Sequence, residues 1–320
     1  MTFLILRFFI FGISLTLAKE ISIQEIPLKG LITDPKQEIS GMDWYGHNLF
    51  LLPENLGGFL FMIPKNQIQE ALDTKSPNPI LPIQTIFKTP NYSTLIPGFD
   101  GFEAIAFYGN QVYISIEAEN NGLMEGYLSW GIIDPISYQI TISKNNLKKI
   151  STPIQIDNMS YESIVIHNNN VIMIYEANGA NLLKDPKQIA ISLLDLSLKE
   201  INSQNIEYRL TDATSIYNNK FWAINYFWSG DKKKLKPAPD LITEKYHLTQ
   251  SHKNTETVER LIEFEIKKNN IKKTETEPLE LYLKDGKARN WEAIARFDQH
   301  GFIIATDKYP RMILGYIPNK

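Results

Sequence analysis

The chain has 320 residues, 43% of them hydrophobic, so it can bury a large core as one repeat-built domain or as two ordinary domains. Its 33 basic and 36 acidic residues nearly cancel to a net charge of −3, which excludes the broadly basic face that nucleic-acid binding requires. The absence of cysteine excludes disulfides, thiolate catalysis, lipid attachment at a cysteine and cysteine-based zinc sites.

The first 18 residues resemble a secretory signal peptide. Arg7 stands beside the apolar stretch 8–17, and Thr16-Leu17-Ala18 places small residues before a cut ahead of Lys19. This stretch is too short and too close to the terminus to favour a membrane span, although an uncleaved anchor is the alternative. Export without disulfides is typical of bacterial proteins. We therefore predict a signal peptide over 1–18, no membrane span after its removal, and a periplasmic or secreted protein.

Five similar stretches follow, each continued by a short polar turn and a second apolar strand. The predicted first strands are 39–45, 102–108, 161–167, 211–217 and 291–297. The predicted second strands are 48–52, 111–116, 170–175, 220–225 and 301–306. The repeats begin roughly 50 to 80 residues apart, which suits four-stranded propeller blades with variable outer loops. We predict an all-β fold, a five-bladed β-propeller with four-stranded blades, formed by residues 19–320 as one domain.

The outer strands of the blades are assigned from the shorter apolar runs. The predicted third strands are 58–63, 126–133, 188–194, 258–266 and 312–317, and the predicted fourth strands are 82–87, 139–143, 205–210 and 279–283. The fifth repeat ends after its third strand, so we predict that 21–27 supplies the missing outer strand and closes the ring, removing exposed sheet edges. A short helix at 66–73 and an inserted loop at 229–255 fall outside the pattern, and a loop of that length is typically a functional lid or disordered.

One register position of each repeat carries a polar side chain, and four of the five are acidic. The registered residues are Ser40, Glu103, Glu162, Asp212 and Glu292. Around a propeller axis these side chains would meet at the centre. Further acidic residues on the second strands of the hairpins would lie at the same height along the axis as the registered residues. They are Glu54, Glu117 and Glu176 at one common offset, with Asp307 near it in the fifth repeat.

Carboxylates this close cannot all stay ionised in a narrow channel, so either several take up protons or a cation neutralises them. The side chains at the registered positions provide oxygen ligands, and none of them is a histidine. Hard oxygen ligands in a roomy ring favour Ca²⁺ over Zn²⁺, whereas Mg²⁺ requires a tighter octahedron. We predict that the five registered residues bind Ca²⁺. The alternative is that the acids cap strands or pair with nearby lysines and arginines.

Two arginines stand three residues ahead of registered acids, Arg209 before Asp212 and Arg289 before Glu292. At the rim of an axial pocket they could hold an anionic substrate through bidentate contacts. Alternatively, each pairs with neighbouring acids. The sequence contains no Gly-Xaa-Ser-Xaa-Gly elbow and no glycine-rich phosphate loop.

The first-blade motif of the calcium-activated nucleotidase (apyrase) family resembles Glu38-Ile39-Ser40-Gly41-Met42-Asp43-Trp44-Tyr45-Gly46-His47-Asn48-Leu49-Phe50. Its second-blade motif resembles Gly98-Phe99-Asp100-Gly101-Phe102-Glu103-Ala104-Ile105-Ala106, and its third and fifth resemble Tyr161-Glu162-Ser163 and Trp291-Glu292-Ala293-Ile294-Ala295. The hairpins are also similar to those of the esterase-like phytase and SdiA-regulated propeller families. The resemblance implies a five-bladed propeller with an axial Ca²⁺ bound by the registered residues. Asp212 departs from the nucleotidase pattern, which has Ser there, and the basic nucleotide-binding residues have no clear counterparts.

Three functions fit these features. The first is an exported Ca²⁺-dependent hydrolase of phosphoesters or phosphoanhydrides, with Glu54, Glu117 or Glu176 as general base and Arg209 or Arg289 binding the anion. The second is a carboxylester or lactone hydrolase. The third is a non-enzymatic propeller with a structural Ca²⁺ that binds a ligand or partner. We expect a monomer acting on a small anionic or ester substrate.

Overall fold

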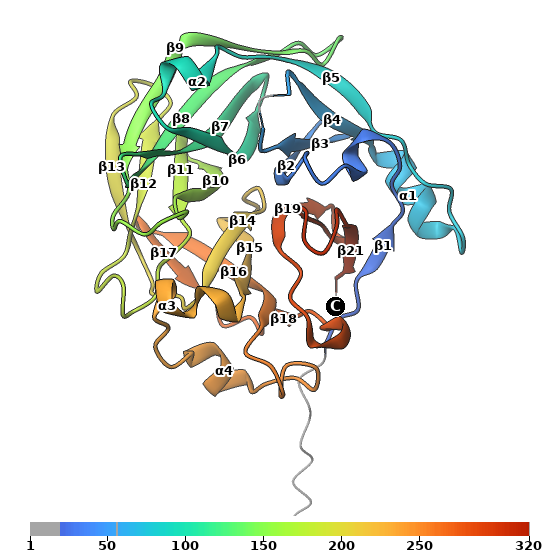
Figure 1. The fold of residues 1–320 in the computed structure, drawn as a ribbon, viewed down its shortest axis with the longest axis vertical. Coiled ribbons are helices and arrows are strands. Elements are labelled where there is room, and N and C mark those ends of the chain that lie inside the picture. The colour runs from blue at the N-terminus through green and yellow to red at the C-terminus, as the bar shows by residue number, and fades with distance from the viewer. Residues whose placement is uncertain (1–19, 56, 320) are drawn as a thin grey trace, which may run out of the picture.

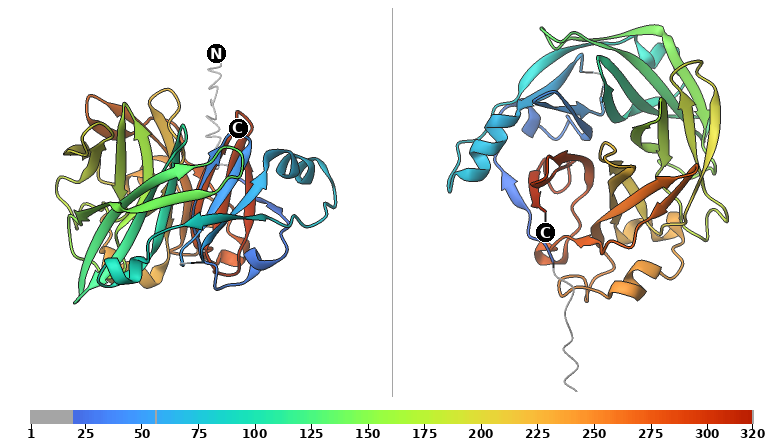
Figure 2. Two further views of the ribbon diagram at one scale, coloured as in Figure 1. Left: turned by 90° about the horizontal axis from the view of Figure 1, so that it is seen from above. Right: turned by 180° about the vertical axis from the view of Figure 1, so that it is seen from behind.

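Five four-stranded antiparallel units stand around a common axis in the computed structural model, which describes residues 20–55 and 57–319 (Figure 1). The predicted signal peptide over 1–18 lies outside the described residues. The innermost strands of the five units pack against one another in cyclic order, which closes the ring. The view from behind shows the same ring (Figure 2). The predicted all-β, five-bladed propeller is confirmed.

The blades follow the chain in order, and each is an up-and-down sheet. Blade 1 comprises β2 (Ile39–Tyr45), β3 (Asn48–Pro53), β4 (Phe59–Pro64) and β5 (Ile83–Lys88). Blade 2 comprises β6 (Phe99–Tyr108), β7 (Gln111–Asn120), β8 (Leu123–Ile133) and β9 (Ile140–Ser151). Blade 3 comprises β10 (Tyr161–His167), β11 (Asn170–Tyr175), β12 (Lys187–Ser192) and β13 (Leu198–Ser203).

The last two blades are less regular. Blade 4 comprises β14 (Arg209–Ala213), β15 (Lys220–Phe227), β16 (Val258–Lys267) and β17 (Asn270–Lys273), with β18 (Leu279–Glu280) also paired to β16. Blade 5 comprises β19 (Trp291–Phe297), β20 (Gly301–Thr306) and β21 (Leu314–Pro318). Its outer strand is β1 (Gln24–Ile26), antiparallel to β21, so the predicted closure by an N-terminal strand is confirmed.

Alternating apolar residues of the inner strands form five hydrophobic clusters, one between each pair of neighbouring blades. Leu49 of blade 1 packs in the cluster that contains Phe297 of blade 5, whereas its neighbour Phe50 packs in the cluster shared with blade 2. Side chains on a strand alternate between faces, so each blade contributes to the clusters on both of its sides. The clusters hold the blades in a rigid ring and fix the inner strand ends around the axis.

Within residues 20–55 and 57–319, four short helices and three 3₁₀ turns connect the strands. The helices are α1 (Lys65–Asp73), α2 (Tyr92–Leu95), α3 (Lys232–Leu235) and α4 (Leu241–Tyr246), and the 3₁₀ turns are Leu31–Thr33, Ser229–Asp231 and Lys284–Gly286. The predicted helix at 66–73 corresponds to α1, on the outside of the ring (Figure 1). None of the described helices is long and apolar enough to cross a membrane.

Two predicted outer strands are wrong. The fourth strand of blade 3 is β13, at 198–203 rather than 205–210, and that of blade 4 is β17, at 270–273 rather than 279–283. Both strands are mostly polar, and each has a single buried residue, so they lack the apolar alternation that identifies a strand in sequence. The predicted insertion at 229–255 contains α3 and α4 and packs on blade 4.

Candidate functional site

Each inner hairpin carries a β-bulge close to the axis, and the bulge sets the registered side chain apart from its strand. In blade 1, Ile39 pairs with Pro53 and Gly41 with Leu52, which leaves Ser40 without a partner residue. Glu103, Glu162 and Glu292 occupy the same unpaired position in their blades. A bulge bends the strand and re-aims the extra residue. Ser40 and the three glutamates all line one axial pocket.

Blade 4 does not follow the predicted register, and the error concerns Asp212. The amide of Leu210 donates to the carbonyl of Glu176 just as the amide of Phe102 donates to the carbonyl of Glu54 in blade 2. Leu210 therefore corresponds to Phe102, and the next residue, Thr211, corresponds to Glu103. Thr211 donates its hydroxyl to the carbonyl of Trp291 at 2.5 Å.

Asp212 does not line the pocket, so the structure does not bring it together with the other four registered residues. Its carboxylate accepts hydrogen bonds from the amides of Ala213 and Ile294, both at 2.7 Å, and so joins blade 4 to blade 5. Asp43 does the same between blades 1 and 2 by accepting from the amides of Trp44 and Phe107, both at 2.8 Å. The two aspartates are interblade connections.

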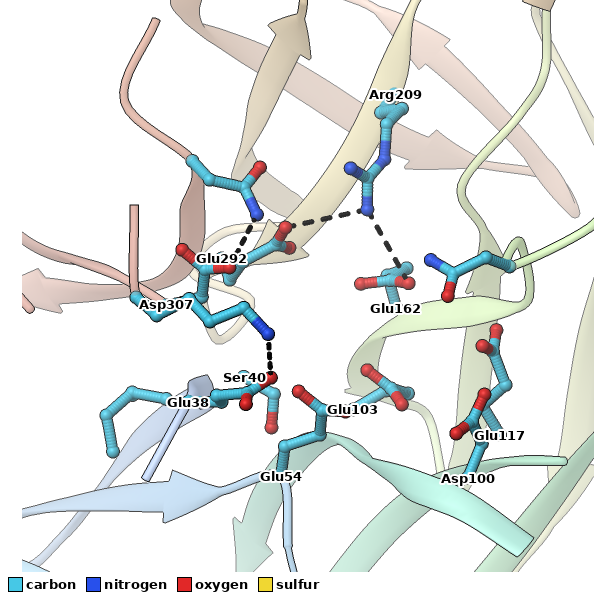
Figure 3. A pocket seen from close by; sticks show the side chains of 14 residues that line it. Glu38, Ser40, Glu54, Asp100, Glu103, Glu117, Glu162, Arg209, Glu292 and Asp307 are labelled. Carbon is cyan, nitrogen blue, oxygen red and sulfur yellow. Dashed lines mark hydrogen bonds and ion pairs between the residues drawn. The ribbon is translucent and has the colours of Figure 1, made fainter. Parts of the chain in front are cut away.

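The axial pocket has a volume of about 210 Å³, and we name it the acidic basin (Figure 3). Its lining is Glu38, Ile39, Ser40, Glu54, Asp100, Glu103, Glu117, Asn158, Glu162, Arg209, Asn290, Glu292, Asp307 and Lys308. This set holds eight carboxyl groups and two cations. Such an excess of acid in a small, partly dry volume must be offset by protons or by an added cation.

On one side of the basin the acids surround Arg209, and we name Arg209, Glu162, Glu176 and Glu292 the arginine side. The Nε atom of Arg209 donates to Glu176, which is fully buried behind it and does not line the basin. Nη2 lies 3.5 Å from Glu292 Oε1 and 3.9 Å from Glu162 Oε1. Burial raises the pKa of Glu176 although the guanidinium opposes that rise.

On the opposite side lie four acids that form no ion pair within the described chain, and we name Glu54, Asp100, Glu103 and Glu117 the open side (Figure 3). Among the described residues, none of these carboxylates forms a salt bridge within 4.0 Å. Glu117 is only 4% exposed, and its Oε2 has no hydrogen-bond partner within the described chain. An unpaired buried carboxylate oxygen is costly, so it identifies a position where a ligand or proton belongs.

The electrostatics of the open side follow from burial and crowding. Burial, followed by a hydrogen bond shared with Glu38 and then the negative charge of Glu38, raises the pKa of Glu54 to about 8. Burial, followed by the repulsion of Glu176, likewise raises the pKa of Glu117 to about 8. Burial and the neighbouring Glu117 raise the pKa of Glu103 well above its usual range. At neutral pH these groups hold protons that a bound cation would displace.

Gly101 is the reason that two acids of the open side can approach each other. A Cβ atom at this position would lie 2.5 Å from Glu54 Cγ and 3.2 Å from Glu103 Oε1. Any larger residue would therefore push these side chains apart. The conformational freedom of glycine is not needed here, only its lack of a side chain.

The basin fits an oxygen-ligated cation chemically. Carboxylates and a serine hydroxyl are the donors that Ca²⁺ prefers, and Glu292 Oε2, like Glu117 Oε2, is buried without a partner in the described chain. Within residues 20–55 and 57–319, no group of three or more His, Cys, Asp or Glu side chains is already placed to hold a metal ion. Cation binding would therefore require the carboxylates to move closer together by side-chain rotation.

Arg289 does not lie at the rim of the basin, so the predicted substrate-binding role is not supported by its position. Its Nη2 lies 2.6 Å from Glu259 Oε2, and Glu259 is fully buried on β16. The Arg289 amide and the Trp291 indole also donate to that carboxylate. The alternative interpretation, that Arg289 pairs with a neighbouring acid, describes the structure.

Glu38 and Asn290 line the basin but were not identified from the sequence pattern, whereas Arg209 was. Glu38, Arg209 and Asn290 all stand two residues ahead of the bulge position of their blades, so they form a second ring of axial side chains. Lys308, which also lines the basin, pairs with Glu38 at 2.7 Å. The position two residues ahead of the bulge recurs in every blade, so the sequence could have revealed this second ring. The residues that occupy it differ in chemical type, however, and form no recognisable motif.

The geometry defines a closed β-propeller with an acidic, partly cation-balanced basin at its axis. No protein-family model matches the chain, and no curated protein matches its sequence. Among solved structures, a glycoside hydrolase family 43 endo-arabinanase from Bacillus licheniformis is similar over 92% of this chain and 95% of its own, at 11% identity and a TM-score of 0.50. A thermostable family-43 glycoside hydrolase is similar over 91% of both chains, at 13% identity and a TM-score of 0.51. At such identities the likeness extends to the propeller fold.

Proposed function

We propose that the protein is an exported hydrolase that binds a divalent cation, Ca²⁺, in the acidic basin and cleaves phosphoester or phosphoanhydride bonds of a small anionic substrate. The observation that carries this proposal is the open side, where Glu54, Glu103 and Glu117 crowd together without a protein cation. The unpartnered Oε2 atoms of Glu117 and Glu292 support it, because both are buried carboxylate oxygens in the basin lining.

The proposed ligands come from the bulge positions. Ser40, Glu103, Glu162 and Glu292 line the basin from four blades, and Thr211 holds the equivalent position in blade 4 in place of Asp212. When bound, Ca²⁺ would supply the positive charge that offsets these carboxylates and polarises a substrate oxygen. Rotation of a few glutamate side chains is enough to bring the oxygens together, since the backbone positions already surround the axis.

The chain's own residues then divide into a base and an anion-binding group. Once a bound cation has displaced the protons that Glu54 and Glu117 hold at neutral pH, either carboxylate would be free to accept a proton from an attacking water. Glu176 is less suited to this role, since it lies behind Arg209 and its carboxylate is bound to Nε. Arg209 is directed into the basin by Glu176, and its Nη2 can hold a substrate oxygen.

Hydrolysis of a carboxylester or lactone is the second candidate function. A separate cleft beside the basin is lined by Tyr226 and Trp228, and an aromatic surface of this kind suits an uncharged substrate group. The same cation would polarise a carbonyl oxygen in that reaction, so the two candidates differ in substrate rather than in the groups that act.

The test is a hydrolysis assay of the cation-free protein against nucleotides, phytate, pyrophosphate and simple esters, with Ca²⁺ or with a chelator. We expect Ca²⁺-dependent release of phosphate, and loss of at least about a hundredfold in rate for Glu103→Gln. Glu119→Gln is the matched control, because Glu119 is an exposed residue of β7 that does not line the basin. Activity that is unchanged by chelator would contradict both hydrolase candidates, and no activity with any substrate would favour a binding function.

A further inference from the structure

A second cleft opens directly beside the acidic basin, and we name it the aromatic cleft. Its volume is about 810 Å³, compared with about 210 Å³ for the basin. The lining is Arg209, Tyr226, Trp228, Ser229, Asp231, Thr255, Thr257, Gly286, Lys287, Ala288, Asn290, Asp307 and Tyr309. Arg209, Asn290 and Asp307 line both spaces, so a single molecule can occupy the two together. The basin is large enough for an ion and one small group, and the cleft is sized for the remainder of a ligand.

The insertion at 229–255 builds one wall of the aromatic cleft, and buried polar contacts fix that wall to blade 4. Arg260, which is 1% exposed, bonds Asp240 at 2.8 Å and Asn225 at 2.8 Å. Asp240 also caps α4 by accepting from the amide of Ile242. Glu207 accepts the amide of Ala238 at 3.0 Å. These contacts fix residues 238–240 of the insertion to blade 4, and the cleft-lining Ser229, Asp231 and Thr255 lie at the two ends of the same insertion.

Trp228 presents a flat apolar surface to this cleft. Its side chain is 53% exposed, and it is the one tryptophan among the five that is mostly open to solvent, all five lying in the described chain. Gly230 allows the indole to lie flat, because a Cβ atom there would fall 2.1 Å from the ring atom Cζ3. Tyr309, 61% exposed, stands in the same lining. Exposed aromatic faces inside a cleft are typical of ring recognition.

The rest of the lining is polar rather than apolar. The hydroxyls of Ser229, Thr255 and Thr257 can each donate and accept hydrogen bonds. Asn290 Oδ1 is a buried acceptor without a partner among the described residues. An unsubstituted aromatic ligand would leave these groups unpaired, whereas a ring that carries several hydroxyls would satisfy them while its C–H face covers Trp228.

The charges of the cleft limit how many anionic groups the ligand carries. Arg209 and Lys287 are balanced by Asp231 and Asp307, so the cleft has no net positive charge. Arg209 is the one cation that lines both the cleft and the basin among the described residues. A ligand with one anionic group at the basin end therefore fits better than a ring with anionic groups all around it.

We propose that the aromatic cleft binds the sugar ring of a singly phosphorylated substrate, with the ring on Trp228 and the phosphate directed past Arg209 into the acidic basin. This inference rests on the proposed function for the identity of the anionic group. It narrows the substrate class from any small phosphoester to a sugar phosphate, and it assigns the insertion at 229–255 a role in specificity.

The test measures binding separately from hydrolysis. Glucose 1-phosphate is titrated into the Ca²⁺-loaded protein, and binding is followed by equilibrium dialysis and by the fluorescence of the exposed Trp228. We expect saturable quenching, and binding weakened about tenfold in Trp228→Ala and in Gly230→Ala, which displaces the indole without removing it. Tyr217→Ala is the control, because Tyr217 is an exposed aromatic of blade 4 that lies outside the cleft.

The kinetic arm compares substrates with and without the ring. For glucose 1-phosphate, KM should rise about tenfold in Trp228→Ala, while the kinetics of pyrophosphate stay unchanged. Glycerol 3-phosphate or phenyl phosphate binding as tightly as glucose 1-phosphate would overturn the proposal, as would wild-type affinity in Trp228→Ala. If glucose 1-phosphate binds in a Trp228-dependent way but no phosphate is cleaved, the cleft assignment holds and the hydrolase proposal fails.

Discussion

The two sides of the acidic basin hold the same kind of side chain but balance its charge in different ways. On the arginine side, Glu162, Glu176 and Glu292 share one internal cation, Arg209. On the open side, Glu54, Glu103 and Glu117 form no salt bridge within the described chain. The protein thus supplies a permanent counter-charge to half of the basin and leaves the other half to protons or to a bound cation.

This difference indicates which half of the basin is structural and which is functional. A buried ion pair is strongly destabilising to break, so the arginine side should behave as part of the fold. Crowded acids that are left unpaired cost stability, and folds retain such positions mainly where they act on a ligand. Variants that change a charge or a contact on one side of the basin at a time are the sharpest tests of this interpretation.

The largest effect is expected from removing the internal cation. Arg209→Met should lower the free energy of unfolding at pH 8 by about 3 kcal/mol, because Glu176 is then buried without a partner. Denaturant unfolding measures this loss, which should shrink at pH 5, where the carboxyls can take up protons. Arg311→Met is the control, since Arg311 pairs with Glu25 at the exposed surface and should cost less than about 1 kcal/mol. Equal losses in the two variants would remove the distinction between the sides.

The pH dependence of the cation-free protein should be the next largest effect. Glu54 and Glu117 have an ordinary pKa of 4.5, raised to about 8 in the folded protein. The native state therefore keeps protons that the unfolded chain releases, and the associated stability is full below about pH 4.5 and lost as pH rises through about 8. In chelator, the melting temperature should fall over that interval more steeply for wild type than for Glu54→Gln/Glu117→Gln.

Added Ca²⁺ should reverse this loss at pH 9, because it binds the ionised native state in preference to the unfolded chain. A wild-type melting temperature with the same pH slope as the double variant would show that these two carboxyls are not forced together in the folded protein.

A smaller effect is expected from filling the gap at Gly101. Gly101→Ala should cost about 1–3 kcal/mol, because its Cβ would lie 2.5 Å from Glu54 Cγ. Glu54→Ala removes the clashing atom, so the double variant should be more stable than the sum of the two single changes predicts. Chemical denaturation of the four proteins gives the coupling energy. Simple additivity would mean that Gly101 does not set the approach of the open-side acids.

The smallest effect is expected for the open side itself in the absence of a cation. Glu117→Gln should change the free energy of unfolding by less than about 1 kcal/mol at pH 4, since the carboxyl is then neutral in the folded protein and mostly neutral in the unfolded chain. Glu176→Gln should cost more, because it removes the partner of Arg209. Glu117→Gln costing as much as Glu176→Gln would contradict the assignment of the two sides.

The inner hairpins could be predicted from the sequence because they repeat a strong local pattern. Apolar residues alternate along both strands of each hairpin, as at Phe302 and Ile304, and polar turns separate them. The outer strands β13 and β17 could not be predicted equally well, since their exposed residues need no apolar pattern. Tertiary pairing rather than local composition places them.

The site was predicted in part, and its errors have local physical causes. Glu103, Glu162 and Glu292 were identified because each follows an aromatic residue at the bulge. In blade 4, Thr211 and Asp212 are both left unpaired by the bulge, so sequence alone could not tell which one is equivalent to Glu103. Arg289 resembles Arg209 in spacing, but the acid that captures it, Glu259, lies on a strand distant in sequence. The aromatic cleft depends on the folding of the insertion, which has no periodic pattern.

The most direct measurement of the central claim is calorimetric titration of Ca²⁺ into the cation-free protein at pH 8, in buffers of different ionisation enthalpy. We predict saturable binding accompanied by proton release, lost in Glu103→Gln and retained in Glu119→Gln, because the open-side carboxyls must ionise to hold the ion. An absence of Ca²⁺ binding by the wild-type protein, or undiminished binding by Glu103→Gln, would contradict the account.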